Sequence, residues 1–80
     1  MPVEIVETLD DLKEYIDTCR VIRYRVLSNE IRIRAGGVGA IIKIDNPQEK
    51  EKIISWLNSL KETKRVIKVI DVVPDDEFFT

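Results

Sequence analysis

Apolar and polar side chains alternate along residues 21–27, and they alternate again along residues 31–35. A period of two is typical of strands that bury one face and expose the other. A two-residue turn at Ser28-Asn29 brings the two stretches together in a register that aligns their apolar positions. The facing pairs would be Val26 with Ile31, Tyr24 with Ile33, and Ile22 with Ala35. The pattern therefore predicts an antiparallel hairpin in one defined register.

A second hairpin follows directly, because Gly36-Gly37 separates residues 31–35 from another apolar stretch that ends at Asp45. Two glycines favour a type I′ turn, in which both central residues have positive φ. This turn would again place apolar residues opposite one another: Ala35 and Val38, Ile33 and Ala40, and Ile31 and Ile42. We therefore expect a three-stranded antiparallel meander over residues 21–45.

Capping sequences mark the start of two helices. Thr8 can accept a hydrogen bond from the backbone N–H three residues later, and Asn46-Pro47-Gln48-Glu49 combines an N-cap, a proline and a glutamate in the favoured order. Apolar residues then recur every three or four positions, as in an amphipathic helix. The predicted buried stripes are Leu9, Leu12, Ile16 and Cys19 in the first helix and Ile53, Trp56, Leu57 and Leu60 in the second. We expect the second helix to end near Thr63.

Short β-branched segments lie on either side of this central part. Residues 3–7 predict a first strand, and residues 65–73 predict a last strand that Pro74 ends. The last segment is apolar at both alternating sets of positions, except for Lys68 and Asp71. Such a pattern is typical of a strand that is central or covered on both faces.

The expected element order is β-α-β-β-β-α-β, an α+β two-layer sandwich in which both helices cover one face of a mixed five-stranded sheet. This architecture resembles the ferredoxin-like sandwich, which has one strand fewer. A likeness of this kind implies nothing about activity, because one fold hosts unrelated functions. We expect a single α+β domain over residues 1–74 and an acidic and aromatic tail over residues 75–80.

The composition excludes several kinds of chemistry. The 80-residue chain has no histidine and one cysteine, Cys19, so it has neither a disulfide framework nor a zinc-type ligand set. The lack of histidine also removes the common catalytic triads and dyads, which need a base that titrates near neutral pH. An enzyme is therefore not favoured, no cofactor or metal is expected, and we expect Cys19 to be buried and inert.

Residue usage bears on the cellular setting and on the oligomeric state. Ile and Val supply 21 residues and 28 more are charged, a composition that leans toward a thermophilic protein. The acidic start of the chain and the lack of an apolar run of ~18 residues predict a cytoplasmic protein without a membrane segment. A chain of this size buries only ~60% of its unfolded surface, so we expect a homodimer to add stability.

Charge is distributed unevenly along the chain. Residues 1–19 carry one lysine against six acids, residues 20–43 carry five arginines and one lysine against Glu30, and residues 44–80 carry six bases against eight acids. The corresponding net charges are −5, +5 and −2, within a total of −2. The chain is therefore dipolar, and its positive charge lies in the predicted meander.

The predicted registers concentrate this positive charge on the solvent side of the meander. Arg25 would lie opposite Arg32 and Arg23 opposite Arg34, although like charges in such positions destabilise a sheet. Gly39 would lie opposite Arg34 and leave a notch beside the glycine turn, where an anion would fit. Arginine binds phosphate or carboxylate through two parallel hydrogen bonds. The candidate residues for binding an anion or a partner are Arg23, Arg25, Arg32, Arg34, Lys43, Gly36, Gly37 and Gly39.

Other interpretations of this basic face stay open. It can be a solvated surface coated with arginine, or acids elsewhere in the fold can neutralise it. Nucleic acid is disfavoured by the acidity of the whole chain and by the inward position of Tyr24, since single-stranded bases stack on exposed aromatic rings. Residues 36–39 join two strands, so they match no nucleotide-binding loop.

The C-terminal tail has chemistry that matches the basic face. Asp75, Asp76 and Glu77 immediately precede Phe78 and Phe79. In a docked arrangement the carboxylates would neutralise the arginines and the phenyl rings would cover outward-facing valine and isoleucine. A frayed, solvated terminus is the alternative.

Together these features favour a non-enzymatic interaction module. It would use an arginine-rich and partly apolar sheet face for self-association or for an anionic partner such as an acidic protein. A protein that binds the phosphates of RNA or DNA is the alternative. A small-molecule regulatory domain or an enzyme has only the glycine notch in its favour.

Overall fold

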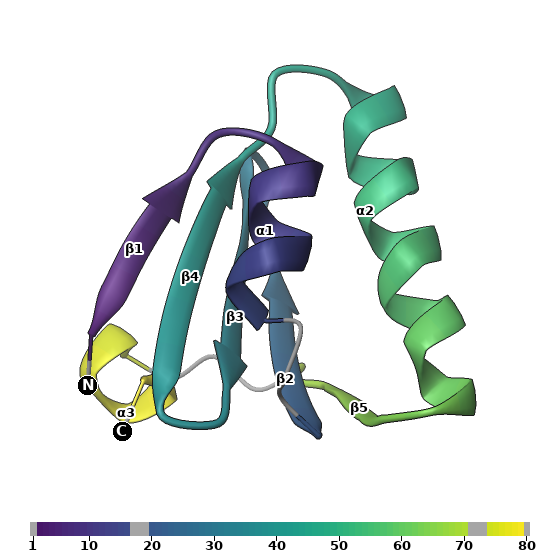
Figure 1. Cartoon of the computed structure of the whole chain (residues 1–80). Coiled ribbons are helices and arrows are strands. Elements are labelled where there is room, and N and C mark those ends of the chain that lie inside the picture. The colour runs from purple at the N-terminus through teal and green to yellow at the C-terminus, as the bar shows by residue number, and fades with distance from the viewer. Residues whose placement is uncertain (1, 17–19, 71–73, 80) are drawn as a thin grey trace.

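A five-stranded sheet and two helices packed on it form the body of the molecule in the computed structural model, which describes residues 2–16, 20–70 and 74–79 (Figure 1). The elements are β1 (Val3–Val6), α1 (Leu9–Ile16), β2 (Val21–Val26), β3 (Glu30–Ala35), β4 (Val38–Lys43), α2 (Pro47–Ser59), the 3-10 turn η1 (Leu60–Glu62), β5 (Arg65–Lys68) and α3 (Asp75–Phe78). This order confirms the predicted α+β fold class with its β-α-β-β-β-α-β body. The short helix α3 follows that body.

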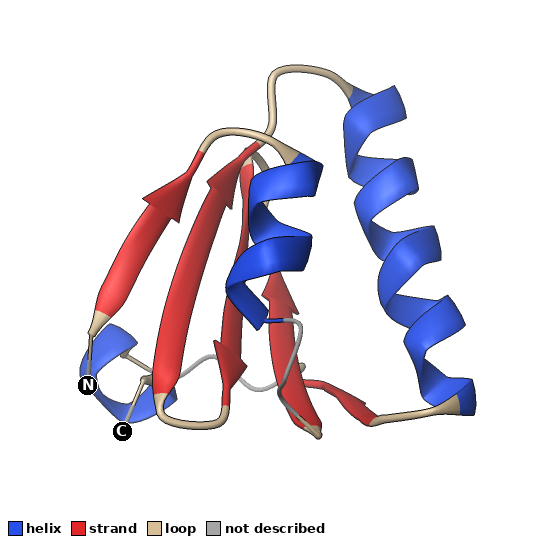
Figure 2. Ribbon diagram, viewed as in Figure 1, coloured by secondary structure: helices blue, strands red, loops and turns tan. Residues whose placement is uncertain are grey.

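The sheet is mixed and has the strand order β1-β4-β3-β2-β5. Strand β3 pairs antiparallel with β2 and β4, whereas β1 is parallel to β4 and β5 is parallel to β2. Helices α1 and α2 make the crossover connections and lie on the same face of the sheet, as predicted (Figure 2). We call the opposite face of the sheet the outer face.

The registers of the meander agree with the prediction at every apolar pair. Residues Ile22, Tyr24 and Val26 of β2 pair with Ala35, Ile33 and Ile31 of β3, which in turn pair with Val38, Ala40 and Ile42 of β4. The turn between β3 and β4 differs from the prediction, because only Gly36 has a positive φ, at 61°. Positive φ at the first central residue alone corresponds to a type II′ turn and not to type I′. Two glycines permit both turns, so the sequence could not decide between them.

Both helix starts have the predicted caps. The backbone N–H of Asp11 donates to Oγ1 of Thr8 over 3.1 Å, and the backbone N–H of Glu49 donates to Oδ1 of Asn46 over 2.9 Å. Pro47 occupies the first position of α2, where its missing N–H has no helical partner to lose. The caps therefore fix where the two crossover helices begin.

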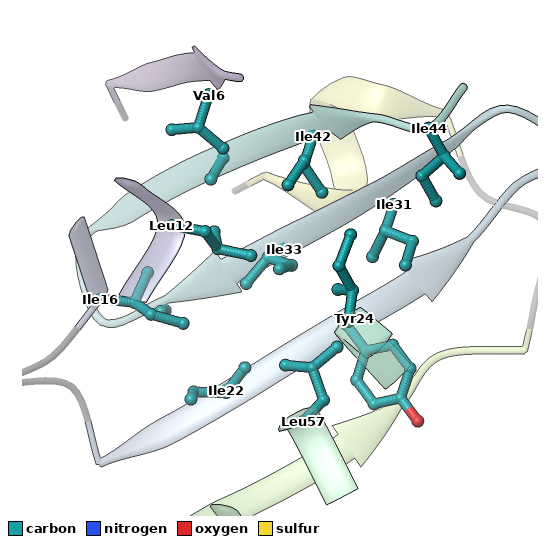
Figure 3. Close-up of a cluster of buried hydrophobic side chains, with 13 residues drawn as sticks. Val6, Leu12, Ile16, Ile22, Tyr24, Ile31, Ile33, Ile42, Ile44 and Leu57 are labelled. Carbon is teal, nitrogen blue, oxygen red and sulfur yellow. The ribbon is translucent and has the colours of Figure 1, made fainter. Parts of the chain in front are cut away.

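The core lies between the sheet and helices α1 and α2 (Figure 3). Leu12 and Ile16 of α1 and Leu57 of α2 are fully or almost fully buried. They cover the inward side chains of the meander, which are Ile22, Tyr24, Ile31, Ile33, Ala35, Ala40 and Ile42. Burial of one large aliphatic side chain contributes ~1.5–3 kcal/mol, so this single layer of contacts dominates the stability. The predicted core residue Cys19 lies outside the described residues.

Trp56 and Leu60 of the second predicted stripe are only half-buried. They pack against the edge of the core and not in its centre. The ammonium group of Lys13 on α1 lies 6.0 Å from the centroid of the Trp56 ring. At this distance a lysine adds a weak cation–π contact between the two helices.

The last strand differs from the prediction. Strand β5 covers only Arg65–Lys68 and pairs only with β2, so it is an edge strand and not a central one. Helix α2 carries the chain past β3 and β2 to the far edge of the sheet, because β1 already occupies the free side of β4. Apolar residues lie on both faces of this strand, because Val66 packs against the core while Ile67 pairs with Arg23 of the outer face. Val69 and Ile70 follow outside any strand, and residues 71–73 lie outside the described residues.

None of the described helices is long and apolar enough to cross a membrane.

Candidate binding face on the outer side of the sheet

The alternation of side chains along the meander decides which residues occupy the outer face. Because Ile22, Tyr24, Ile31 and Ile33 point into the core, their neighbours in the sequence point to the opposite side. These neighbours form a group that we call the arginine band, which consists of Arg23, Arg25, Arg32 and Arg34. Strands β2 and β3 thus present four arginines on the outer face.

The arginine band has two rows across β2 and β3. Arg23 pairs with Arg34 in one row, and Arg25 pairs with Arg32 in the next. Arg23 is exposed, whereas the other three side chains are half-buried. Directly opposite residues in a sheet have Cβ atoms ~4.5–5.5 Å apart, so the four guanidinium groups share a small surface. A carboxylate or phosphate placed above them can accept hydrogen bonds from more than one arginine.

Glu30 offsets part of this charge. Its Oε1 atom accepts from Nη2 of Arg32 over 2.7 Å and from Nε over 3.2 Å, and the two side chains are 17% and 18% exposed. Glu30 also lies opposite Lys43 in the β3–β4 register, where Lys43 remains exposed. Glu30 therefore neutralises Arg32, at one end of the band.

Apolar side chains border the arginine band on the β1 and β4 side. Val3 pairs with Gly39 and Ile5 pairs with Ile41, so these residues continue the two arginine rows across the sheet. Val3 is 41% exposed and Ile5 is 65% exposed. The rows therefore change from basic to apolar within one strand spacing.

A second apolar border lies on the β5 side of the band. Ile67 pairs with Arg23 and is half-buried, and Val21 at the start of β2 is 38% exposed. The outer face is thus an arginine band between two apolar margins.

The predicted notch over Gly39 is filled by the ring of Phe79. A Cβ atom built on Gly39 would come within 2.6 Å of Cδ1 and 2.8 Å of Cε1 of Phe79, and within 3.1 Å of Cγ2 of Val3. Any side chain at this position would collide with the ring. The absence of a side chain on Gly39 therefore creates a pocket for an aromatic ring, where the sequence suggested room for an anion.

Phe78, the last residue of helix α3, is buried next to Phe79. Helix α3 begins after Pro74, whose carbonyl oxygen accepts from the N–H groups of Glu77 and Phe78 over 3.1 and 3.0 Å. Phe78 and Phe79 are only 5% and 8% exposed, and their rings meet edge to face with centroids 4.9 Å apart. Glu77 is exposed. Figure 1 shows α3 beside the starts of β1 and β4, on the side of the sheet away from β5.

Acidic residues of β1, of α1 and of the connection between them gather elsewhere. Glu4, Glu7, Asp11 and Glu14 line an open cleft of about 500 Å³ between β1 and α1. No group of three or more histidine, cysteine, aspartate or glutamate side chains among the described residues is arranged to hold a metal ion. This acidic cluster therefore lies on the helix side of the β1 edge, apart from the arginine band.

The structure places the predicted residues in four groups. The four arginines form the band with Lys43 at its Glu30 end, and Gly36 and Gly37 form the β3–β4 turn. Gly39, Phe78 and Phe79 belong to the aromatic pocket, and Asp75, Asp76 and Glu77 belong to α3.

Sequence reasoning missed Val3 and the helical form of the tail. Val3 lines the aromatic pocket because β1 pairs with β4, a contact between distant segments that no local pattern encodes. The helix did have a signal: Pro74 is followed by Asp75, Asp76 and Glu77, and proline with acids in the first turn favours a helix start.

Comparison of the chain with family models, with curated proteins and with solved structures finds no match.

Proposed function

We propose that this protein is a non-enzymatic binding module that uses its outer face for self-association or for an anionic partner. The observation that carries the proposal is the β2–β3 register, which sets Arg23 beside Arg34 and Arg25 beside Arg32. Arg23 and Arg34 are like charges in directly opposite positions, an arrangement that costs stability in a sheet, whereas Glu30 offsets the charge of Arg32 in the other row. An arrangement that costs stability is explained if the arginines bind an anionic partner.

The composition of the outer face fits a protein partner. Protein interfaces are enriched in arginine and combine apolar with polar surface. Here the arginine band lies between margins that expose Ile5 and Val21. A partner with carboxylates flanked by apolar side chains would match both features.

Nucleic acid fits this face less well. Bases of single strands stack on exposed aromatic rings. Tyr24 is 3% exposed in the core and Phe79 is 8% exposed in the pocket. Binding to RNA or DNA would therefore depend on phosphate contacts alone and would show little sequence preference.

A binding titration tests the proposal. A fluorescently labelled acidic peptide and a labelled single-stranded DNA of equal net charge are titrated with the full chain at low and at moderate salt. We expect the acidic peptide to bind and to dissociate as salt is added. Replacing Arg23 and Arg34 by glutamine should weaken the binding by at least about fivefold, since charge-assisted hydrogen bonds are worth ~1.5–3 kcal/mol each.

The matched control replaces Lys52 and Lys61 by glutamine. Both lysines are exposed, on α2 and η1, and the control removes the same charge from the opposite layer. It should bind the peptide as the unaltered chain does. Equal weakening by both pairs of substitutions, or no binding of either anion and no self-association, would refute the proposal, and tighter binding of DNA than of peptide would point to the nucleic-acid alternative.

A further inference from the structure

The structure points to the chemistry of the partner, and this inference rests on the proposed function. We propose that the outer face binds an acidic protein segment that carries a phenylalanine, and that the pocket over Gly39 takes the phenyl ring. The chain's own C-terminal tail occupies the pocket in this structure and therefore competes with any partner. The partner segment would have the chemistry of that tail, three acids followed by two phenylalanines.

The pocket is shaped for an aromatic ring. The ring of Phe79 approaches the backbone of Gly39 so closely that a Cβ there would lie 2.6 Å from a ring carbon. Val3 closes the pocket from β1, and a Cβ on Gly39 would lie 3.1 Å from its Cγ2 atom. Close approach of a ligand group to the backbone is a reason for glycine in a strand, where glycine otherwise weakens the sheet. The burial of Phe79 to 8% exposure shows that the fit is nearly complete.

The arginine band begins next to the pocket. Arg34 pairs with Gly39 across β3 and β4, and Arg23 continues the same row on β2. The pocket over Gly39 therefore lies one or two strand spacings, about 5–10 Å, from the backbone of Arg34 and Arg23. Carboxylates next to a ring in the pocket would be within reach of these long side chains. Arginine and carboxylate form the strongest hydrogen bonds between protein side chains. The pocket and the band thus recognise two parts of one ligand.

The attached tail lowers the apparent affinity for a partner. A ligand joined to its site by a short link has an effective concentration of the order of millimolar. A separate segment must displace it, so only a partner that binds more tightly or at high local concentration would occupy the pocket. The tail therefore competes with any partner from within the same chain. This competition sets the lowest affinity at which a partner can occupy the pocket.

A peptide with the sequence of residues 74–80 tests the inference in the full-length chain. Labelled peptide is titrated into the unaltered protein and into Phe79→Ala, whose pocket is empty. We expect Phe79→Ala to bind the peptide at least about tenfold more tightly than the unaltered chain, because the attached competitor is gone. The double variant Gly39→Ala/Phe79→Ala should lose this gain, since the alanine methyl group occupies the pocket. Equal affinity of all three proteins would overturn the inference.

Two altered peptides separate this inference from the proposed function. A peptide in which both phenylalanines are alanine should bind Phe79→Ala weakly, and full affinity would overturn the aromatic pocket while leaving the arginine band intact. A peptide in which the three acids are replaced by their amides should also bind weakly. Full affinity of that peptide would refute the role of the arginine band while leaving the pocket intact.

A measurement without a destabilising substitution covers the case in which Phe79→Ala fails to fold. The full chain carries 4-fluorophenylalanine only at position 79, and unlabelled peptide is added in excess. We expect the fluorine resonance of the buried ring to decrease while a resonance of an exposed ring increases. A single unchanged resonance at peptide concentrations above the millimolar range expected for the attached tail would overturn the inference.

Discussion

Arg23 lies directly opposite Arg34 on the outer face, and the two residues belong to the neighbouring strands β2 and β3. Like charges in this position oppose the pairing of β2 with β3, whereas the apolar residues on the other side of the same strands favour it. Burial of the apolar side chains outweighs the charge repulsion. One aliphatic core residue stabilises the fold by ~1.5–3 kcal/mol, whereas a cross-strand charge pair changes the stability by only ~0.2–1 kcal/mol. The strands can therefore keep a charged row that lowers their own stability.

Reversal of one charge in this row should stabilise the fold. In Arg23→Glu a carboxylate faces Arg34, so the repulsive pair becomes attractive and the free energy of unfolding should rise by ~0.2–1 kcal/mol. Urea denaturation measures the change. Lys61→Glu makes the same change of charge on η1, at an exposed position away from the sheet, and should not stabilise. A lower free energy of unfolding for Arg23→Glu would contradict this account of the row.

Gly39 is intolerant of a side chain, whereas Gly37 in the adjacent turn is tolerant. The methyl group of Gly39→Ala would overlap the ring of Phe79, so we expect a loss of ~1–3 kcal/mol in the free energy of unfolding. Gly37 has no heavy atom within 4 Å of a built Cβ, and its φ is not positive. Gly37→Ala should leave stability unchanged or raise it by ~0.4–1 kcal/mol. Equal effects of the two substitutions would show that Phe79 does not occupy the pocket in solution.

The N-cap of α2 makes a measurable contribution. Asn46→Ala removes the acceptor of the 2.9 Å hydrogen bond from the Glu49 N–H and should lower the free energy of unfolding by ~0.5–2 kcal/mol. Asn58→Ala is the control, because Asn58 is exposed near the other end of the same helix and alanine has the higher helix propensity. Chemical denaturation of both variants gives the comparison, and a loss confined to Asn58→Ala would show that the cap is not formed.

Self-association should involve the β1 side of the outer face. Ile5 is 65% exposed on an edge strand, and a small chain gains stability by covering such a surface. We expect a dimer at micromolar concentration, which Ile5→Lys converts to a monomer in sedimentation equilibrium. Ile70→Lys changes an even more exposed isoleucine beyond the opposite edge and should leave the dimer intact. A monomeric unaltered chain at high concentration would exclude this interface.

The predictable part of the fold is the part that local patterns determine. Alternation along β2 and β3 allowed one register that paired Ile22, Tyr24 and Val26 with Ala35, Ile33 and Ile31. The same register gave the pairs of the arginine band. The caps at Thr8 and Asn46 are likewise local, since each involves residues three apart. These features follow from a few neighbouring residues, so a single sequence is enough to predict them.

The remaining features depend on which distant segments meet. The sequence suggested that β5 is central, because Val66 and Ile67 are apolar although they point to opposite faces of the sheet. The strand order, however, decides whether such a strand has one neighbour or two. The aromatic pocket needs Val3 from β1, Gly39 from β4 and Phe79 from the terminus in one place. No periodic pattern in the sequence predicts that these three distant segments come together. The sequence therefore indicated the residue types of the candidate site but not the occupant of its pocket.

The strand order also separates the sheet into parts that can form at different times. The pairs of β2 with β3 and of β3 with β4 join consecutive segments through short turns, whereas the parallel pairs β1–β4 and β5–β2 join segments separated by other strands. Closing a longer loop costs more chain entropy, so contacts between nearby segments form first. The three central strands would then be the folding nucleus, and their amide hydrogens should exchange with solvent more slowly than those of β1 and β5. Because the aromatic pocket needs β1, it would be completed only at the end of folding, after the arginine band is already in place.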